Sequence, residues 1–306
     1  MRQYIIRRLL QVLPIILLVA TTVFFLFKLI PGDPAAVFAG EQAAPDTIAR
    51  VREQLGLDQP VMVQYVRYLQ RLVRGDLGRS FISGVNVLDS IRARFPNTIR
   101  LAMISTALSA SLGILMGLVS ALKRESAVDY LLTVIALVGI SIPIFWLGLM
   151  LIYIFSVQMR LLPIAGSATW KHYIMPVITL SMVSLASILR ITRSSILEAM
   201  SEDFVRTARA KGLRESRIVF RHVLPNALIP VVTVVGLQFG YMLGGSIITE
   251  TIFGWPGMGR LLVTAVNQRD VMVVQGVLVV FASSFVLVNL FVDIIYAVVD
   301  PRISYR

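Results

Sequence analysis

Six long apolar stretches dominate this sequence of 306 residues. The hydrocarbon core of a bilayer is about 30 Å thick, so a helix needs about 20 apolar residues to cross it. The stretches that reach this length are Leu9–Ile30, Ile99–Leu122, Tyr130–Val157, Tyr173–Leu189, Ala227–Ile248 and Val271–Val299. They predict an all-α polytopic membrane protein with six transmembrane helices, folded as a single membrane domain over residues 1–306.

The composition agrees with this prediction and argues against several functions. Hydrophobic residues make up 57% of the chain and charged residues 15%, and the mean hydropathy is +0.79, whereas soluble domains are about half apolar and about a quarter charged. There is no cysteine, hence no disulfide framework and no thiolate metal site. The phosphate-binding GxxxxGK[ST] motif, the nucleophile elbow, HExxH and paired carboxylates are all missing from the sequence, so we expect neither an enzyme nor a bound cofactor.

The placement of basic residues predicts the orientation of the chain. With the N-terminus inside, the inside segments 1–8, 123–129, 190–226 and 300–306 hold 15 Lys and Arg residues, against four in the short outside loops 158–172 and 249–270. Short cytoplasmic loops are enriched in Lys and Arg, so both termini are expected in the cytoplasm, as in a multi-pass protein of the cytoplasmic (inner) membrane. The same rule explains the net charge of +12 without nucleic acid.

The long outside segment, residues 31–98, is expected to form a helical cap. One amphipathic helix is predicted from Asp46 to Gly56, and a second runs from Pro60 to Gly75. The apolar stripe of the second helix consists of Val61, Tyr65, Tyr68, Leu69 and Leu72. This stripe packs on the membrane helices, docks an extracytoplasmic partner, or does both; Tyr65, Tyr68, Leu69 and Leu72 are the candidate docking residues.

Small residues recur at a spacing of four in two of the apolar stretches. The fifth contains Gly236, Gly240 and Gly244, and the second contains Gly113 and Gly117. A bare glycine face lets helix backbones approach closely, so these glycines predict tight helix packing, either within the chain or against a second membrane subunit. A substrate path along the face is the less favoured alternative.

Two further residues inside the apolar stretches stand out. Pro143 predicts a kink in the third helix. Asp293, in the sixth stretch, is a functional candidate because ionisable residues are rare in membrane helices. We expect it to lie near the cytoplasmic surface and to pair with an arginine of a cytoplasmic loop.

The stretch SEDFVRTARAKGLRESRIVFRHVLPNALIP, from Ser201 to Pro230, is charged although it follows and precedes apolar helices. Its first half predicts a short helix with a cap and acids at its start, basic residues toward its end, and glycine as its stop. Those residues are Ser201, Glu202, Asp203, Arg206, Thr207, Ala208, Arg209, Ala210, Lys211 and Gly212. A second amphipathic piece is expected to end at Leu224 and Pro225. Such a helix, protruding from the cytoplasmic segment 190–226, could seat in a groove of another protein; otherwise it is a solvated basic loop.

This stretch resembles a loop found in the membrane subunits of ATP-binding-cassette importers. The family pattern is EAA, three residues, Gly, nine residues, then I-x-L-P. Placing Gly212 on the family glycine puts Leu224 and Pro225 on the final pair with the spacing intact, whereas Arg206, Thr207 and Ala208 replace EAA and His222 replaces the isoleucine. LIPGDPA, QLGLDQP, GDLGRS, MLGGSIITETIFGWPGMGRLL and the ending VDPRI extend the resemblance over nearly the whole chain, to the B-type permease of dipeptide and oligopeptide importers.

The resemblance implies a type I importer transmembrane fold and a set of partners. These would be a C-type permease subunit, two cytoplasmic ATPases that bind ATP and Mg²⁺, and an extracytoplasmic substrate-binding protein, all assembled in membrane lipid. The residues from Ser201 to Gly212, with Leu224 and Pro225, would couple the ATPases to the membrane helices. The cargo would be dipeptides or oligopeptides; close relatives carry glutathione or nickel chelates.

Two alternatives from other classes remain on the sequence alone. A secondary, ion-coupled carrier would need an internal inverted repeat and polar groups near the bilayer midplane, and neither is evident. A membrane enzyme would need a catalytic set, which is not apparent.

Overall fold

The computed structural model describes residues 2–29, 34–39, 43–54 and 56–299. In these ranges the chain is helical apart from turns and one isolated bridge between Arg79 and Asn86. The long helices are α1 (Arg2–Leu29), α5 (Val87–Leu122), α8 (Lys171–Ser201), α11 (Leu224–Ile252) and α13 (Val271–Val299). The shorter elements are α2 (Pro34–Ala39), α3 (Pro45–Gln54), α4 (Val61–Val73), α6 (Ala127–Ser141), α7 (Ile144–Leu151), the π-helix η1 (Ile152–Gln158), α9 (Asp203–Ala210), α10 (Glu215–Ile218), the π-helix η2 (Val219–Val223) and α12 (Met258–Asn267).

Length and composition support the predicted set of membrane helices. Five helices of the described chain are long and apolar enough to cross a bilayer, and a bent pair formed by residues 127–141 and 144–158 makes a sixth. The helix of the second span begins earlier than its apolar stretch, because residues 87–98, predicted as part of the outer loop, belong to α5. Residues 30–33 of the LIPGDPA motif and Leu55 of the predicted outer helix lie outside the described residues.

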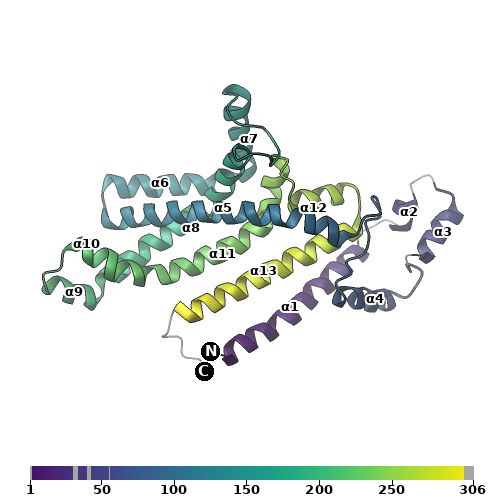
Figure 1. The fold of residues 1–306 in the computed structure, drawn as a ribbon, viewed down its shortest axis with the longest axis horizontal. Helices are drawn as coiled ribbons and strands as arrows, with labels where there is room; N and C mark the ends of the chain where they lie inside the picture. Colours follow the sequence, from purple (N-terminus) through teal and green to yellow (C-terminus); the bar gives the residue numbers. More distant parts are fainter. Residues whose placement is uncertain (1, 30–33, 40–42, 55, 300–306) are drawn as a thin grey trace.

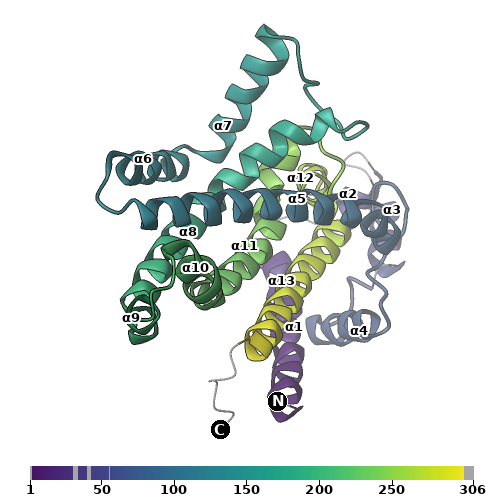
Figure 2. The same cartoon turned by 60° about the vertical axis from the view of Figure 1, so that its left-hand side comes forward.

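The bend predicted at Pro143 is present, but it is larger than a kink, because the helix of the third span is interrupted there. The helical segments 127–141 and 144–158 are bent by 99° relative to each other. Ile142 is extended, with φ −78° and ψ 122°, and ends α6. A residue before proline is pushed out of the helical region, and proline has no N–H for the helical ladder. As a result the chain turns outward at this point: α7 contacts the end of α11, where a Cβ on Gly148 would lie 3.5 Å from Ile252, and η1 extends away from the bundle (Figures 1 and 2).

Glycines bring the helices of the bundle together within this one chain. A Cβ placed on Gly117 would lie 2.6 Å from Cβ of Thr192 and 2.8 Å from the carbonyl oxygen of Leu189, both on α8. On α11, Gly236 faces Val292 of α13, and a Cβ on Gly240 would lie 3.3 Å from the ring of Phe285. Gly113 likewise faces Ile188 of α8. Gly244 differs, because a Cβ there would meet nothing within 4 Å.

This contrast gives a stability prediction with a built-in control. We expect Gly117→Ala to lower the free energy of unfolding by about 1–3 kcal/mol, because the added methyl group overpacks the contact between α5 and α8. Gly244→Ala should change it little. Thermal unfolding of both purified variants in the same detergent measures the difference. Equal melting temperatures for the two variants would contradict the assignment of Gly117 to a close backbone contact.

Candidate functional site

The short helix α9 lies at one end of the bundle, between the end of α8 and α10 (Figures 1 and 2). The residue before this helix, predicted as a Ser201 cap, is Glu202, so the predicted start is wrong by one residue. Ser201 is the last residue of α8, where its Oγ donates a hydrogen bond to the carbonyl oxygen of Glu198 at 2.7 Å. Glu202 is extended and precedes α9, and its side chain makes no capping bond. The acidic first turn is retained through Asp203.

Two small apolar residues anchor α9 to the bundle. Val205 and Ala208 are 1% and 6% exposed, and they join a buried cluster with residues of α5, α8, α10, η2 and α11. The members of that cluster are Leu118, Ala121, Ile196, Ala199, Val205, Ala208, Ile218, Val219, Val223 and Ala227. Ala208, one of the predicted coupling residues, is therefore an anchor rather than a contact surface. Any displacement of α9 acts on the ends of several long helices through this cluster.

The other side of α9 is exposed. The exposed predicted coupling residues, on α9 itself or directly flanking it, are Ser201, Glu202, Asp203, Arg206, Thr207, Arg209, Ala210, Lys211 and Gly212. Phe204 is also exposed, at 39%. Sequence reasoning did not select Phe204, although an aromatic residue is unusual on a solvent-facing helix surface and is enriched where proteins bind one another.

Gly212 ends α9 in a Schellman motif. Its φ is +72°. The N–H of Gly212 donates to the carbonyl oxygen of Arg209 at 2.9 Å, and the N–H of Leu213 donates to that of Ala208 at 3.3 Å, which is the bonding pattern of this C-terminal cap. Across the turn, the Arg209 guanidinium donates to both carboxylate oxygens of Glu215, at 2.7 and 3.3 Å. This hydrogen-bonded pair raises the pKa of Arg209.

Leu224 and Pro225 do not end a helix, contrary to the prediction. The helical run from Glu215 to Ile252 is continuous through α10, η2 and α11. Pro225 lies in the first turn of α11, directly after the π-helical stretch η2. Proline has no N–H to give to the α-helical ladder, and a π-helical turn changes the bonding register at that point. Leu224 is half-buried against the α9 cluster, and Pro225 is exposed.

An ion pair between a buried carboxylate and a partly exposed arginine lies near the same end of the bundle. Asp129, in the first turn of α6, is 3% exposed. Its carboxylate accepts hydrogen bonds from Nε and Nη2 of Arg193 on α8, at 2.8 and 2.7 Å, from the N–H of Glu125 at 3.0 Å, and from the hydroxyl of Ser120. The pair therefore ties α6 to α8, and it was not foreseen from the sequence. Asp293 is half-buried on α13, and its predicted arginine partner stays a prediction.

A second buried carboxylate fixes α12 at the opposite end of α11. Glu250 is 0% exposed. It accepts hydrogen bonds from the hydroxyl of Thr98 at 2.7 Å and from the N–H groups of Gly259 and Arg260, at 2.6 and 3.2 Å. These N–H groups open α12, where backbone donors are otherwise unpaired. The TETIFGWPGMGR part of the sequence is thus folded around Glu250.

Two of the candidate docking residues of the outer helix α4, Tyr65 and Tyr68, face α1. The hydroxyls of Tyr65 and Thr21 of α1 form a hydrogen bond of 2.6 Å, and the ring of Tyr68 stacks on Phe24 with centroids 5.5 Å apart. Burial raises the pKa of Tyr68 to about 12. Leu69 and Leu72 are half-buried. Packing on a membrane helix, one of the two alternatives for this stripe, therefore accounts for both tyrosines.

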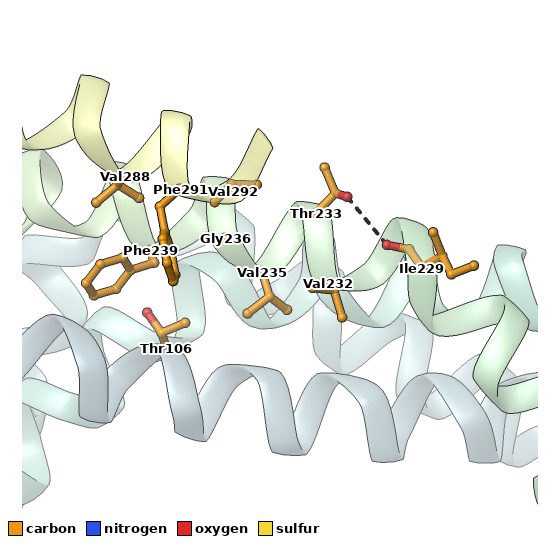
Figure 3. Close-up of a pocket in the computed structure, with 10 residues that line it drawn as sticks. All are labelled: Thr106, Ile229, Val232, Thr233, Val235, Gly236, Phe239, Val288, Phe291 and Val292. Carbon is orange, nitrogen blue, oxygen red and sulfur yellow. Dashed lines mark hydrogen bonds between the residues drawn. The ribbon is translucent and has the colours of Figure 1, made fainter. Parts of the chain in front are cut away.

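A cavity of about 270 Å³ lies between α5, α11 and α13 (Figure 3). Its lining is apolar apart from the hydroxyls of Thr106 and Thr233. Thr233 donates to the carbonyl oxygen of Ile229 at 3.4 Å, and Thr106 contacts Sδ of Met242 at 3.2 Å. The cavity presents no charged group to the termini of a peptide. Nearby on α11, Gln238 accepts a hydrogen bond from Ser184 of α8 at 3.1 Å.

Comparison with known proteins decides the family. Residues 113–305 match the model of the binding-protein-dependent transport system inner membrane component, and residues 1–102 match that of the N-terminal part of the same kind of membrane component. The chain belongs to this family of importer permeases. It is 45% identical over 306 residues, the whole of both chains, to the glutathione transport system permease proteins GsiC of Escherichia coli K12 and Salmonella typhimurium LT2.

Solved structures support the importer fold. The inward-facing methionine transporter MetNI aligns with a TM-score of 0.60 and 19% identity, over 69% of this chain and 96% of that chain. An amino acid transporter of the same class aligns with a TM-score of 0.51 and 20% identity, over 69% and 92%. The permease is therefore a transport component with the fold of importer transmembrane domains, and the secondary-carrier and enzyme alternatives lose their basis. Among the described residues, no cluster of three or more acidic or histidine side chains could hold a metal ion.

Proposed function

We propose that this permease forms half of the membrane path of an ATP-driven importer of short peptides, with glutathione as the first substrate to test. The proposal that this permease is coupled to an ATPase rests on α9. This short helix has an exposed polar side and is anchored to five other elements through Val205 and Ala208. Full-length identity of 45% to glutathione permeases supports the choice of substrate. Dipeptides, longer peptides and nickel chelates are the alternatives.

Coupling works through the exposed side of α9. In this proposal a cytoplasmic ATPase, which binds ATP and Mg²⁺ itself, receives α9 in a surface groove. The contact residues are Phe204 and the exposed members of the set from Ser201 to Gly212. Closure of two ATPases displaces α9, and the buried cluster passes the displacement to α5, α8 and α11. The Asp129–Arg193 pair extends it to α6.

Two exposed surfaces suit a second permease subunit. The arm formed by α7 and η1 exposes large apolar side chains, among them Phe145, Trp146 and Tyr153. On α11, Leu237, Tyr241 and Ile248 are exposed on the face that also carries the open Gly244. A glycine on an open helix face allows close approach of a neighbouring helix. We assign both surfaces to contact with a C-type subunit and to the path between the subunits.

The proposal includes an orientation of the permease in the membrane. Both termini lie in the cytoplasm together with α9, and α2, α3, α4 and α12 lie outside, where an extracytoplasmic binding protein delivers the substrate. The apolar cavity of Figure 3 offers no partner for charged peptide termini. Substrate choice is accordingly left mainly to the binding protein.

Uptake by cells that lack the gene for this chain tests the substrate. Labelled glutathione uptake should fall on deletion and return when the chain is restored, and unlabelled glutathione should compete better than a dipeptide or a nickel chelate. Unchanged glutathione uptake with lost dipeptide uptake would reassign the substrate to ordinary peptides.

A further inference from the structure

The outer helix α4 carries an exposed apolar row beside a basic row. Met62, Val66 and Val73 are 66%, 50% and 89% exposed, and with the half-buried Leu69 they recur at spacings of four, three and four. This spacing places them on one helix face. The basic row is on another face and consists of Arg67, Arg71 and Arg74, all exposed. The face toward α1, with Tyr65 and Tyr68, separates the two rows.

Contacts with α1 fix which row points toward the bilayer interior. Lys28 donates from Nζ to Oε1 of Gln64 at 2.6 Å, and the Thr21 and Tyr65 hydroxyls are also 2.6 Å apart. Thr21 precedes Lys28 by seven residues, which is about 10 Å deeper along the apolar helix α1. Of the residues on α4, Gln64 shares the side of the basic row and Tyr65 the side of the apolar row. The apolar row therefore faces the depth of the membrane, and the basic row faces its surface.

The surroundings of both rows agree with this polarity. On α1, Leu18, Phe25 and Leu26 are exposed at 66%, 39% and 52%, so the apolar surface continues from the span to the outer helix. On the other side, a hollow of about 520 Å³ lies between α4, α1 and the start of α13. Its charged lining consists of Lys28, Arg67, Arg71, Arg74 and a single acid, Glu53.

We propose that α4 is an interfacial helix that lies in the lipid leaflet at the C-terminal end of α1, with its apolar row among the acyl chains and its basic row at the phosphate headgroups. An amphipathic helix in this position buries its apolar face by about 5–10 Å, and arginine side chains extend to the headgroups. In the proposed orientation this is the outer leaflet. The occupant of the exposed apolar face is thus phospholipid and not the binding protein.

Site-directed spin labels test the placement directly, because the chain has no cysteine to remove. Val66→Cys and Val73→Cys report on the apolar row, and Arg67→Cys and Arg71→Cys report on the basic row. Leu18→Cys on α1 is the lipid reference, and Ser83→Cys, on an exposed loop, is the water reference. Collisions with oxygen and with a water-soluble nickel chelate are measured on the full chain, assembled with its second subunit and ATPases and reconstituted in phospholipid vesicles, before and after the binding protein is added.

We expect the preference for oxygen over nickel collisions to reverse between neighbouring positions of α4. Labels at positions 66 and 73 should resemble the Leu18 reference, with oxygen collisions favoured, and labels at 67 and 71 should shift toward the Ser83 reference. Nickel collisions at 66 and 73 equal to those at 71 would overturn the proposal. Loss of nickel access there only after the binding protein is added would instead assign the row to that protein. The readout does not depend on transport, so it stays informative if the proposed substrate is wrong.

Discussion

Replacing Gly212 with valine is expected to abolish ATP-driven uptake while the protein stays in the membrane. Gly212 has φ +72°, and the left-handed region costs an L-residue about 1–2 kcal/mol, more for a β-branched one. A Cβ at this position meets nothing within 4 Å, so the effect arises from the backbone and not from a clash within the chain. Without the Schellman motif, α9 loses the turn that sets it against α10. Uptake and the amount of co-purifying ATPase are the measurements.

Gly212→Asn is the matched control. Asparagine tolerates the left-handed region better than other residues, so this variant should keep most of the uptake and most of the bound ATPase. Normal uptake in Gly212→Val would refute the coupling role of the turn. Equal loss in both variants would show that space at the ATPase contact matters, rather than the backbone conformation.

Arg193→Met is expected to produce the largest loss of stability among changes at this end of the bundle. It leaves the carboxylate of Asp129 buried without its charged partner. Removing one member of a fully buried ion pair costs about 3–5 kcal/mol. The loss here should be smaller, because the Arg193 side chain is 30% exposed and Ser120 and the N–H of Glu125 still donate to the carboxylate. The purified variant should melt at a clearly lower temperature, and uptake should fall because α6 is no longer held to α8.

The double variant Asp129→Asn with Arg193→Met separates the ion pair from simple packing. It removes both charges, so it should recover a large part of the stability that Arg193→Met loses. Melting temperatures of the two single variants and the double variant form a double-mutant cycle. Additive losses would mean that Asp129 and Arg193 do not depend on each other, which would contradict the geometry.

The membrane helices could be predicted because their signal is local. Apolar length alone located six spans, and the N-terminal charge and glycine of the α9 segment located a short helix. The effects of two prolines differed from those predicted. Pro143 ended a helix where a kink was expected, and Pro225 continued one where an end was expected. Both prolines follow an apolar residue and lack a backbone N–H, so these local features do not say whether a helix is interrupted or its register is shifted.

The contacts that stabilise the two ends of the bundle, the candidate site among them, depend on residues distant in sequence. Asp129 and Arg193 are 64 positions apart, and Thr98 and Glu250 are 152 apart. A single sequence shows that these residues are polar but not which of them meet. The glycine pattern was more informative, yet it did not reveal that Gly236 and Gly240 face α13 whereas Gly244 is open. That distinction requires the helix arrangement.

Uptake by proteoliposomes tests the central claim most directly. The importer containing this permease is purified with its co-purifying ATPases and second subunit, reconstituted, and supplied with the binding protein and labelled glutathione. We predict uptake only when ATP is present on the side that carries the ATPases, and none with Gly212→Val. Transport by this chain alone in the absence of ATP would contradict the account and restore the ion-coupled carrier.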